Sequence, residues 1–226
     1  MTDREKKRLN RQTMCDRLAM EFQDDWVVNL GAGMPTLCSN YPFVDRDIIF
    51  QSENGLIGYG LLAKEGEEDP NCVNAGSQYV VLRPGTAVVH HADSFTIIRG
   101  GYVNVTVLGA YEVAENGDFA NWKMAGRKGG SIGGAMDLAV GAQRVWIAME
   151  HTTRDGRPRL LKRCSLPVTA VGVVGLVVTD LGLFEVTDAG FVLREIAPGY
   201  TPEEVQAVTE AKLTIADDLT PFRGAI

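Results

Sequence analysis

The sequence predicts an α/β protein with an open, mostly parallel layered sheet and flanking helices. Short apolar segments rich in β-branched residues alternate along the chain with segments of helical periodicity, which is typical of layered α/β folds. The chain has 226 residues, 45% of them hydrophobic, so it can bury a substantial core. No internal repeat, low-complexity segment or convincing linker interrupts it, and we therefore expect residues 1–226 to form one domain.

The first elements follow from caps and apolar patterns. Residues 2–5 have a capping-box pattern that predicts a helix start, and the residues after them form an apolar stripe at helical spacing. A short strand is expected at 26–30, followed by a turn and a helix at 36–41. The turn lacks the third glycine of a dinucleotide-binding loop and has a proline close by, so we do not predict a nucleotide cofactor there.

The next segment combines a buried strand with an isolated carboxylate. Residues 48–50 are apolar and precede the glycine-rich stretch 51–60, for which we expect a sharp turn with Glu53 at its hinge. Such a turn after a strand end is a good mount for a reactive side chain, because the strand fixes position and glycines leave room for substrate. Locally, the same residues also fit a solvated glutamate in an ordinary Asn-Gly turn.

Strand patterns dominate the middle of the chain. We expect strands at 79–82 and 86–89, joined through a Pro-Gly turn, and then a short helix capped by residues 92–94 and ending at 99–101. Residues 102–108 are rich in β-branched and aromatic side chains and should form a central strand.

A second glycine-rich loop begins the last part of the chain. Residues 126–134 lead into an expected helix at 135–140, and backbone N–H groups at such a helix start can bind anions or developing oxyanions. Further strands are expected at 145–149, 171–179, 182–186 and 191–193. A second capping box at 201–204 predicts a final helix to about residue 212.

Composition argues against several classes of function. The formal net charge of -7 and the lack of a basic stripe with interleaved aromatics disfavour nucleic-acid binding. The four cysteines form no CxxC pair and predict reduced thiols. A charged N-terminus and the lack of a long apolar run predict a soluble cytoplasmic protein with no membrane partner.

Other candidate reactive residues are weaker. We expect the adjacent His90 and His91 to lie in a strand and point to opposite faces, and no partner has metal-ligand spacing, so no metal is predicted. His151 follows a strand, where a structural hydrogen bond is favoured over substrate contact. The chain has no Gly-x-Ser-x-Gly elbow, and Cys164 fits packing or a turn better than catalysis.

Eight segments, taken together and in order, resemble the B subunit of the family I CoA-transferases, the 3-oxoacid CoA-transferase group. The resemblance extends from the first strand to the last helix. The segments are NLGAGMPT (29–36), QSENG (51–55), NAG (74–76), ADSF (92–95), RGG (99–101), GDFANW (117–122), GGAMDL (133–138) and CSLP (164–167).

The resemblance implies a Rossmann-like CoA-transferase fold and a covalent reaction. It identifies Glu53 as the nucleophile that forms a mixed anhydride and then a glutamyl-CoA thioester, and Gly134 as the donor of an oxyanion-binding N–H. CoA enters as a thioester substrate, so no cofactor is expected. The residues expected to contact CoA or substrate are Asn54, Gly55, Gly31, Gly33 and Gly133.

Substrate and partner are also implied by resemblance. Segments 90–95, 139–142, 180–181 and 184–187 look closest to transferases that move CoA from succinyl-CoA to 3-oxoadipate in aromatic catabolism, with acetoacetate or another short acid as the alternative. Only a B-like half is present, which implies an A-like partner, with two copies of each chain. Ala32, Ala170 and residues 131–132 depart from the family pattern and leave substrate fit open. The rival interpretations are a thioester hydrolase and an inactive B-like scaffold.

Overall fold

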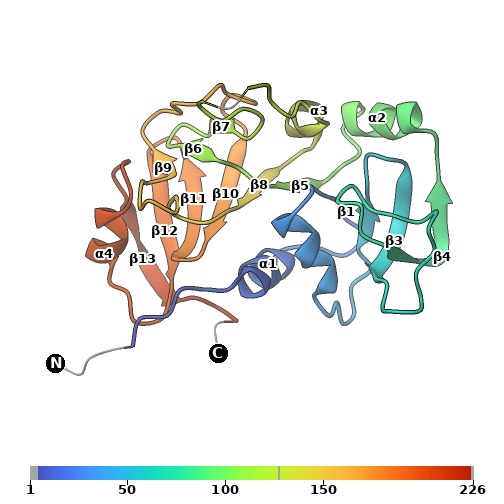
Figure 1. Cartoon of the computed structure of the whole chain (residues 1–226). Coiled ribbons are helices and arrows are strands. Elements are labelled where there is room, and N and C mark those ends of the chain that lie inside the picture. The colour runs from blue at the N-terminus through green and yellow to red at the C-terminus, as the bar shows by residue number, and fades with distance from the viewer. Residues whose placement is uncertain (1–4, 127, 225–226) are drawn as a thin grey trace.

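The computed structural model describes residues 5–126 and 128–224 and has a layered α/β architecture (Figure 1). Within these residues no helix is long and apolar enough to cross a membrane. The elements, in chain order, are α1 (Arg11–Ala19), β1 (Val27–Leu30), η1 (Met34–Asn40, a 3-10 helix), β2 (Ile49–Gln51), β3 (Leu56–Leu62), β4 (Val80–Val88), α2 (His91–Arg99), β5 (Val105–Leu108), β6 (Glu112–Ala114), β7 (Phe119–Ala120), α3 (Ala135–Gly141), β8 (Val145–Ala148), β9 (Leu160–Leu161), β10 (Val174–Thr179), β11 (Gly182–Thr187), β12 (Gly190–Ile196), α4 (Pro202–Ala207) and β13 (Thr214–Pro221).

The main sheet is parallel at its centre, antiparallel on the β3-β4 side and mixed on the other side, where β12 and β13 are parallel. In the described part of the chain it has ten strands in the order β13-β12-β11-β10-β8-β5-β1-β2-β3-β4. Strands β10, β8, β5, β1 and β2 are parallel to one another, as the alternation of strands and helices predicts. The hairpins β2-β3-β4 and β10-β11-β12 add antiparallel pairings on either side of this centre. A small second sheet has the order β7-β6-β9.

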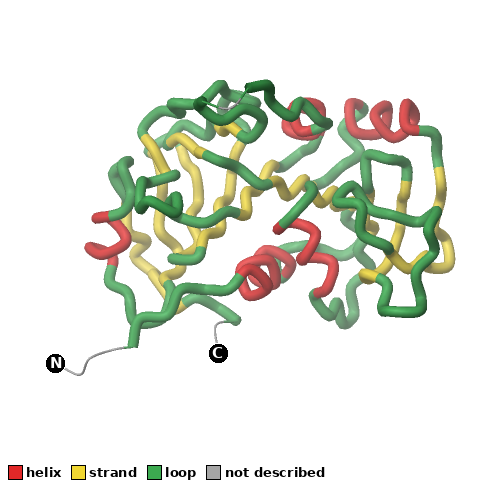
Figure 2. The backbone as a smooth tube through the Cα atoms, in the orientation of Figure 1, coloured by secondary structure: helices red, strands yellow, loops and turns green. Residues whose placement is uncertain are grey.

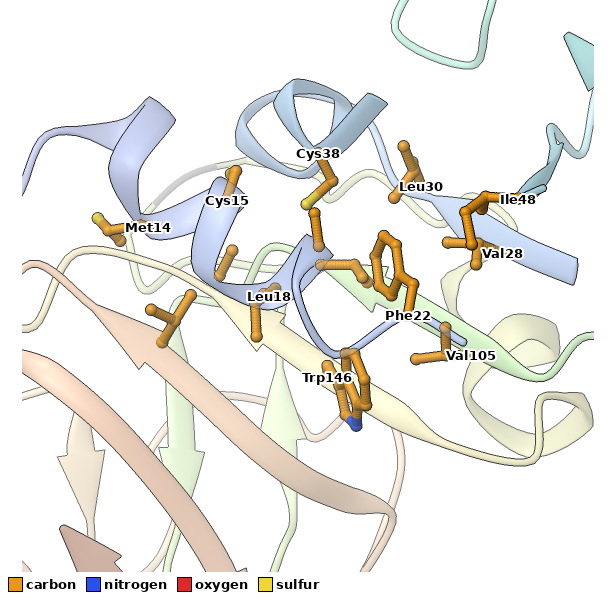
Figure 3. Close-up of a cluster of buried hydrophobic side chains, with 14 of the residues drawn as sticks. Met14, Cys15, Leu18, Phe22, Val28, Leu30, Cys38, Ile48, Val105 and Trp146 are labelled. Atoms are coloured by element: carbon orange, nitrogen blue, oxygen red, sulfur yellow. The ribbon is translucent and has the colours of Figure 1, made fainter. Parts of the chain in front are cut away.

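Two hydrophobic cores cover the two faces of the central strands. Alternate residues of β8 belong to different cores: Trp146 packs with the α1 side and Ile147 with the α2 and α3 side. On the α1 side, Phe22 stacks on Trp146 with a ring-centroid distance of 5.7 Å (Figure 3). Figure 2 shows α2 and α3 next to each other, with α1 on the other side of the central strands. Both faces of the parallel centre are therefore buried, as parallel sheets require.

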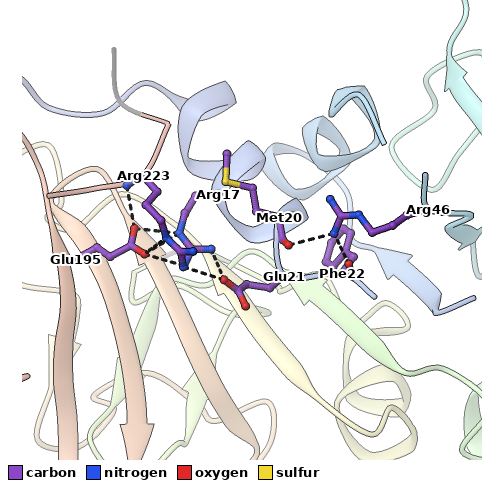
Figure 4. A network of polar contacts seen from close by, with 7 residues as sticks. All are labelled: Arg17, Met20, Glu21, Phe22, Arg46, Glu195 and Arg223. Carbon is purple, nitrogen blue, oxygen red and sulfur yellow. Dashed lines mark hydrogen bonds and ion pairs between the residues drawn. The ribbon is translucent and has the colours of Figure 1, made fainter. Parts of the chain in front are cut away.

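A buried ionic cluster joins α1 to the antiparallel side of the sheet (Figure 4). Arg17 is only 2% exposed, and its Nε donates to both carboxylate oxygens of Glu195 on β12 at 2.9 Å. Arg223 donates to the same carboxylate from its side chain at 2.8 Å and from its backbone at 3.0 Å. Burial alone raises the pKa of Glu195, but the hydrogen bonds from the two arginines outweigh it and lower the pKa.

The first helix begins later than the capping-box pattern predicts. Residues 2–4 lie outside the described part of the chain, and residues 5–10 are not helical. The helix starts at Arg11 with Asn10 as its cap, and the Asn10 side chain accepts a hydrogen bond from the backbone N–H of Thr13 at 2.9 Å. The expected apolar stripe is correct, since Met14, Leu18 and the other stripe residues are buried.

Four other local predictions need correction. The turn expected over 51–60 is confined to residues 52–55, because the rest of this stretch forms β3 with a bulge at Gly58 (φ 78°). The two strands expected within 79–89 form the single strand β4, and α2 is capped by His90. The final helix has the predicted capping box at Thr201 but ends at Ala207, and the edge strand β13 follows.

Candidate active site

A cleft of about 1040 Å³ crosses the carboxyl ends of the central parallel strands. Its lining includes Glu53 after β2, Gly31 after β1, Gly109 after β5, Glu150 after β8 and Asp180 after β10. The chain continues from β1 to β2 on one side, whereas β5 and β8 lie on the other side of β1. Open α/β sheets bind ligands at the carboxyl edge where the strand order reverses in this way. The cleft is therefore the best candidate for the active site.

The turn that carries Glu53 is fixed against the end of β4. The N–H of Gly55 donates to the carbonyl of Ser52 at 3.0 Å, and the N–H of Val89 donates to the carbonyl of Gly55 at 2.9 Å. Gly55 has φ 119°, and a Cβ at this position would lie 2.2 Å from the carbonyl oxygen of Val89. Only glycine fits so close an approach, so Gly55 supports the turn and does not line the cleft.

A buried chain of hydrogen bonds lies beneath this turn. The Thr106 hydroxyl donates to Asn29 at 3.2 Å, and the Asn29 amide donates to the Gln51 side chain at 2.7 Å. The Gln51 amide donates to the Ser94 hydroxyl at 2.7 Å, which donates to the carbonyl of Ser52 at 3.2 Å. Asn29, Gln51 and Thr106 are each the single polar residue of an otherwise apolar strand. That isolation was a sequence signal for a positioning role, and our sequence interpretation did not use it.

The structure brings Glu53 and Gly134 together. A Cβ on Gly134 would lie 3.6 Å from Cγ of Glu53 and 3.0 Å from Cζ of Phe95. Glu53 Oε2 is buried and has no hydrogen-bond partner within the described residues. Burial raises the pKa of Tyr59, and the Glu53 carboxylate raises it further, so the buried phenol is neutral.

The remaining predicted contact residues divide into those in or beside the cleft and those that hold the Glu53 loop from outside it. Gly31 and Gly133 line the cleft beside Glu53. Gly33 caps the start of η1 with φ 89°, and its neighbours on both sides line the cleft. Asn54 is exposed, and its side-chain amide donates to the carbonyl of Val73 at 2.7 Å, so like Gly55 it holds the loop from outside the cleft.

Arginines line the cleft, and the sequence interpretation did not assign them. Arg8 is ion-paired with Asp180 at 2.6 Å, and Arg11 with Glu150 at 3.1 Å. Arg154 and Arg159 also line the cleft. Because these residues lie far apart in sequence, only the folded chain reveals that they share one cavity.

His151 is a structural residue, in agreement with the favoured prediction. Its ring nitrogens are 2.9 Å from the hydroxyls of Thr179 and Thr209. The Thr209 hydroxyl donates to the carbonyl of Val205 at 2.8 Å and must therefore accept from Nε2, which leaves Nδ1 to accept from Thr179. Burial lowers the pKa of His151 to about 4, with smaller opposing effects of Asp180 and Arg8, so the ring is neutral near pH 7.

Cysteine chemistry and metal binding are the two other candidate chemistries. Burial raises the pKa of the Cys164 thiol to about 12, helped by Glu112 and Asp118, so it is not a ready nucleophile. In residues 5–126 and 128–224, no group of three or more His, Cys, Asp or Glu side chains is arranged to hold a metal ion.

Comparison with known protein families identifies the family to which this chain belongs. The family described as Coenzyme A transferase matches residues 11–208 of the chain. The chain belongs to this family. It is therefore a transferase, and the glutamate-containing cleft lies largely within the matched region.

Individual relatives of this CoA-transferase differ in their stated substrates. The B subunit of the 3-oxoadipate CoA-transferase of Pseudomonas putida is 43% identical over 209 residues, which cover 92% of this chain and 97% of the relative. The beta subunit of the acetate CoA-transferase of Escherichia coli K12 is 42% identical over 214 residues, covering 95% and 98%.

Solved structures support the fold. The apoenzyme of an acyl-CoA transferase (YdiF) from Escherichia coli O157:H7 has a TM-score of 0.75 and 20% identity. The match covers 96% of this chain but only 44% of the solved one. This CoA-transferase therefore spans less than half the length of that structural relative.

Proposed function

We propose that this chain is the B subunit of a transferase that moves CoA from succinyl-CoA to a 3-oxo acid, with 3-oxoadipate as the preferred acceptor. One observation carries the proposal: a glutamate with a buried, unpaired carboxylate oxygen faces a cleft at the carboxyl edge of the sheet, next to Gly134. A buried oxygen without a hydrogen-bond donor is costly for stability, so its presence in a cleft points to a chemical role.

The reaction proceeds by exchange of anions at Glu53. Its carboxylate attacks the thioester carbonyl of succinyl-CoA, the CoA thiolate leaves, and a mixed anhydride forms. The thiolate then attacks the Glu53 acyl carbon of the anhydride, expels succinate and leaves a glutamyl-CoA thioester. The acceptor carboxylate attacks this thioester, and the released thiolate attacks the acceptor's acyl carbon to restore Glu53.

This sequence of steps requires no general base. Every nucleophile and every leaving group is an anion, so no proton moves at the reacting atoms. The described residues that line the cleft include no histidine, which fits this chemistry, and His151 next to the lining residue Glu150 is buried and hydrogen-bonded elsewhere. Electrostatic stabilisation of the tetrahedral oxyanion is needed instead, and the backbone N–H of Gly134 supplies it.

The choice of acceptor rests on the relatives and on the charge of the cleft. The Pseudomonas putida relative is named for 3-oxoadipate, and the Escherichia coli K12 relative is named for acetate. Their identities to this chain are 43% and 42%, so overall identity does not separate the two acceptors. We favour 3-oxoadipate because the cleft contains arginines beyond those paired with its own acids, which suits an acceptor with two carboxylates. Acetoacetate or acetate is the alternative.

An A subunit completes the enzyme in this proposal, as two A and two B chains in the cytoplasm. Both relatives described above are named as a B or beta subunit. The structural relative is more than twice as long as the region it shares with this chain, which leaves room for a second half of similar size.

The covalent intermediate gives a direct test. The co-expressed A and B pair is incubated with succinyl-CoA alone, quenched and digested, and the peptide containing Glu53 is analysed by mass spectrometry. We expect a mass increase equal to CoA minus one water on this peptide, and its loss when 3-oxoadipate is added. The matched control is Glu53→Gln, which lacks the carboxylate and should carry no adduct. An adduct on a different residue, or turnover without any adduct, would contradict the proposal.

A further inference from the structure

Arg159 has an unusual environment for a partly buried arginine. Its side chain lines the same cleft as Glu53, and its Nε atom is buried. No hydrogen-bond acceptor for this Nε exists within residues 5–126 and 128–224. A buried N–H of a charged group is normally paired, so the position suits an anion that enters the cleft.

The backbone around Arg159 is held rigidly. Residues 152–158 form a tight hairpin, in which the backbone of Thr153 accepts from Gly156 at 2.9 Å and donates to the carbonyl of Arg157 at 2.8 Å. The N–H of Arg159 then donates to the carbonyl of His151 at 3.1 Å, and its carbonyl accepts from Val113 at 2.9 Å. A fixed backbone holds the attachment point of the guanidinium in place, which favours recognition.

The charges in the cleft leave this arginine without a partner in the described chain. Arg8 and Arg11 line the cleft in ion pairs with Asp180 and Glu150. Among the described residues, neither Arg154 nor Arg159 takes part in an ion pair. This part of the cleft therefore has an excess of positive charge, which favours a ligand with negative charge.

The position of Arg159 relative to Glu53 limits the size of that ligand. Glu53 follows β2, and His151, which holds the backbone of Arg159, follows β8, three places along the sheet. At the usual spacing of neighbouring strands, these two strand ends are about 14 Å apart. Both side chains line the cleft, so the part of it between them has a length suited to a short acyl chain.

We propose that Arg159 binds the second carboxylate of a dicarboxylic acyl substrate while the reacting carboxylate lies at Glu53. The inference rests on the proposed CoA transfer and makes Arg159 the residue that separates dicarboxylic from monocarboxylic acceptors. The planar guanidinium offers parallel N–H donors that match a carboxylate. Nε is one of these donors, which explains why it is buried in the cleft wall without an acceptor from the chain.

The test compares two acceptors of equal chain length, 3-oxoadipate and 3-oxohexanoate, with the co-expressed A and B pair. In a ping-pong reaction the kcat/KM of the acceptor depends only on the half-reaction of the CoA-loaded enzyme, so the donor does not affect the comparison. We expect Arg159→Met to lower kcat/KM for 3-oxoadipate about 30- to 100-fold, and to lower it far less for 3-oxohexanoate. Arg159→Lys should lower kcat/KM for 3-oxoadipate by an intermediate factor, because it keeps the charge but lacks the parallel N–H donors of the guanidinium.

Arg157→Met is the matched control. Arg157 lies on the same hairpin, pairs with Asp155 at 2.8 Å and is not part of the cleft lining, so its removal should leave both acceptors unaffected. An equal fall for both acceptors in Arg159→Met would instead indicate contact with a CoA phosphate, and dissociation of the A and B chains would indicate an ion pair between them. Either result, or no fall at all, overturns the proposal.

A binding measurement separates this inference from the proposed function. Adipate and hexanoate are titrated calorimetrically into the A and B pair without any CoA ester. Arg159→Met should weaken the binding of adipate and leave that of hexanoate nearly unchanged. If the wild-type pair transfers CoA to neither 3-oxo acid, the proposed function fails, and the adipate comparison still decides whether Arg159 binds a second carboxylate.

Discussion

The molecule contains two kinds of buried charge, and they differ in how completely they are paired. Arg17 and Glu195 are almost fully buried, and they form a hydrogen-bonded ion pair that Arg223 supports. In the cleft, Glu53 Oε2 and Arg159 Nε are buried without a partner in the described chain. The first arrangement is expected of a scaffold, and the second of a site that exchanges ligands.

Leaving buried polar atoms unpaired costs free energy, and the place where the protein bears this cost indicates where its function lies. A buried polar atom without a hydrogen bond costs about 1–3 kcal/mol, and charged groups cost more. The ionic cluster avoids this cost because each charged group is hydrogen-bonded within the protein, whereas the cleft keeps one unpaired atom on Glu53 and one on Arg159. Substitutions should therefore affect stability in the cluster and chemistry in the cleft.

The largest effect is expected at the nucleophile. Glu53→Gln removes the attacking carboxylate and should lower the rate of CoA transfer at least about 10⁴-fold. Because it also removes a charge from a buried unpaired oxygen, the variant should melt at the same temperature as the wild type or higher. Glu65→Gln, an exposed carboxylate in the loop after β3, is the control and should change neither property. A Glu53→Gln rate within about tenfold of wild type would remove the glutamate from the mechanism.

The ionic cluster should show the opposite pattern. Glu195→Gln leaves Arg17 buried without its counter-charge and should lower the free energy of unfolding by about 3 kcal/mol, measured by urea denaturation. The folded variant should keep its rate of CoA transfer. Glu185→Gln on the neighbouring strand breaks a half-exposed pair with Arg194 and should cost less than about 1 kcal/mol. Equal losses for the two variants would mean that burial does not distinguish them.

Acid should weaken the scaffold through His151. Its pKa is about 4 in the folded state and near 6.5 when unfolded, so between pH 6.5 and 4 the unfolded chain binds a proton that the folded chain does not. The free energy of unfolding should fall by about 3 kcal/mol as the pH drops from 6.5 to 4, and this contribution should be constant above pH 6.5.

The comparison of two variants isolates this effect from other acids. His151→Gln should be less stable at pH 7, and its stability should depend less on pH between about 6.5 and 4. His91→Gln, on the exposed surface of α2, should keep the wild-type slope. A wild-type slope in His151→Gln would mean that another group causes the acid sensitivity.

The sequence predicted those features that depend on local chemistry. The β-branched segments around Val105 and Val145 are central strands, and the capping box at Thr201 starts α4. It did not predict β13, because this edge strand carries Asp217 and Asp218 and lacks an apolar alternation. Edge strands need few buried side chains, so their alternation of apolar and polar residues is weak.

The candidate site was predictable to a smaller extent. Sequence motifs indicated Glu53 and Gly134, and the fold places them next to each other. The role of Arg159 depends on a hairpin that returns the chain to His151 and on strands that are distant in sequence, and no local pattern reveals that arrangement. Gly55 could be recognised as special, but only the contact with Val89 shows that it supports the turn.

The smallest effect should come from a single methyl group beside the nucleophile. Gly134 has φ -72° and ψ -1°, which alanine adopts without strain, so Gly134→Ala should change the free energy of unfolding by less than about 1 kcal/mol. Its methyl group would lie 3.0 Å from Phe95 and 3.6 Å from Glu53, and displacement of the carboxylate should lower kcat about 10- to 100-fold. Gly175→Ala on β10, where a Cβ meets nothing within 4 Å, is the control for the same change in residue type. Full activity of Gly134→Ala would show that Phe95 and Glu53 can move aside at little cost. The contrast between a rigid ionic cluster and a cleft that requires one geometry would then be wrong.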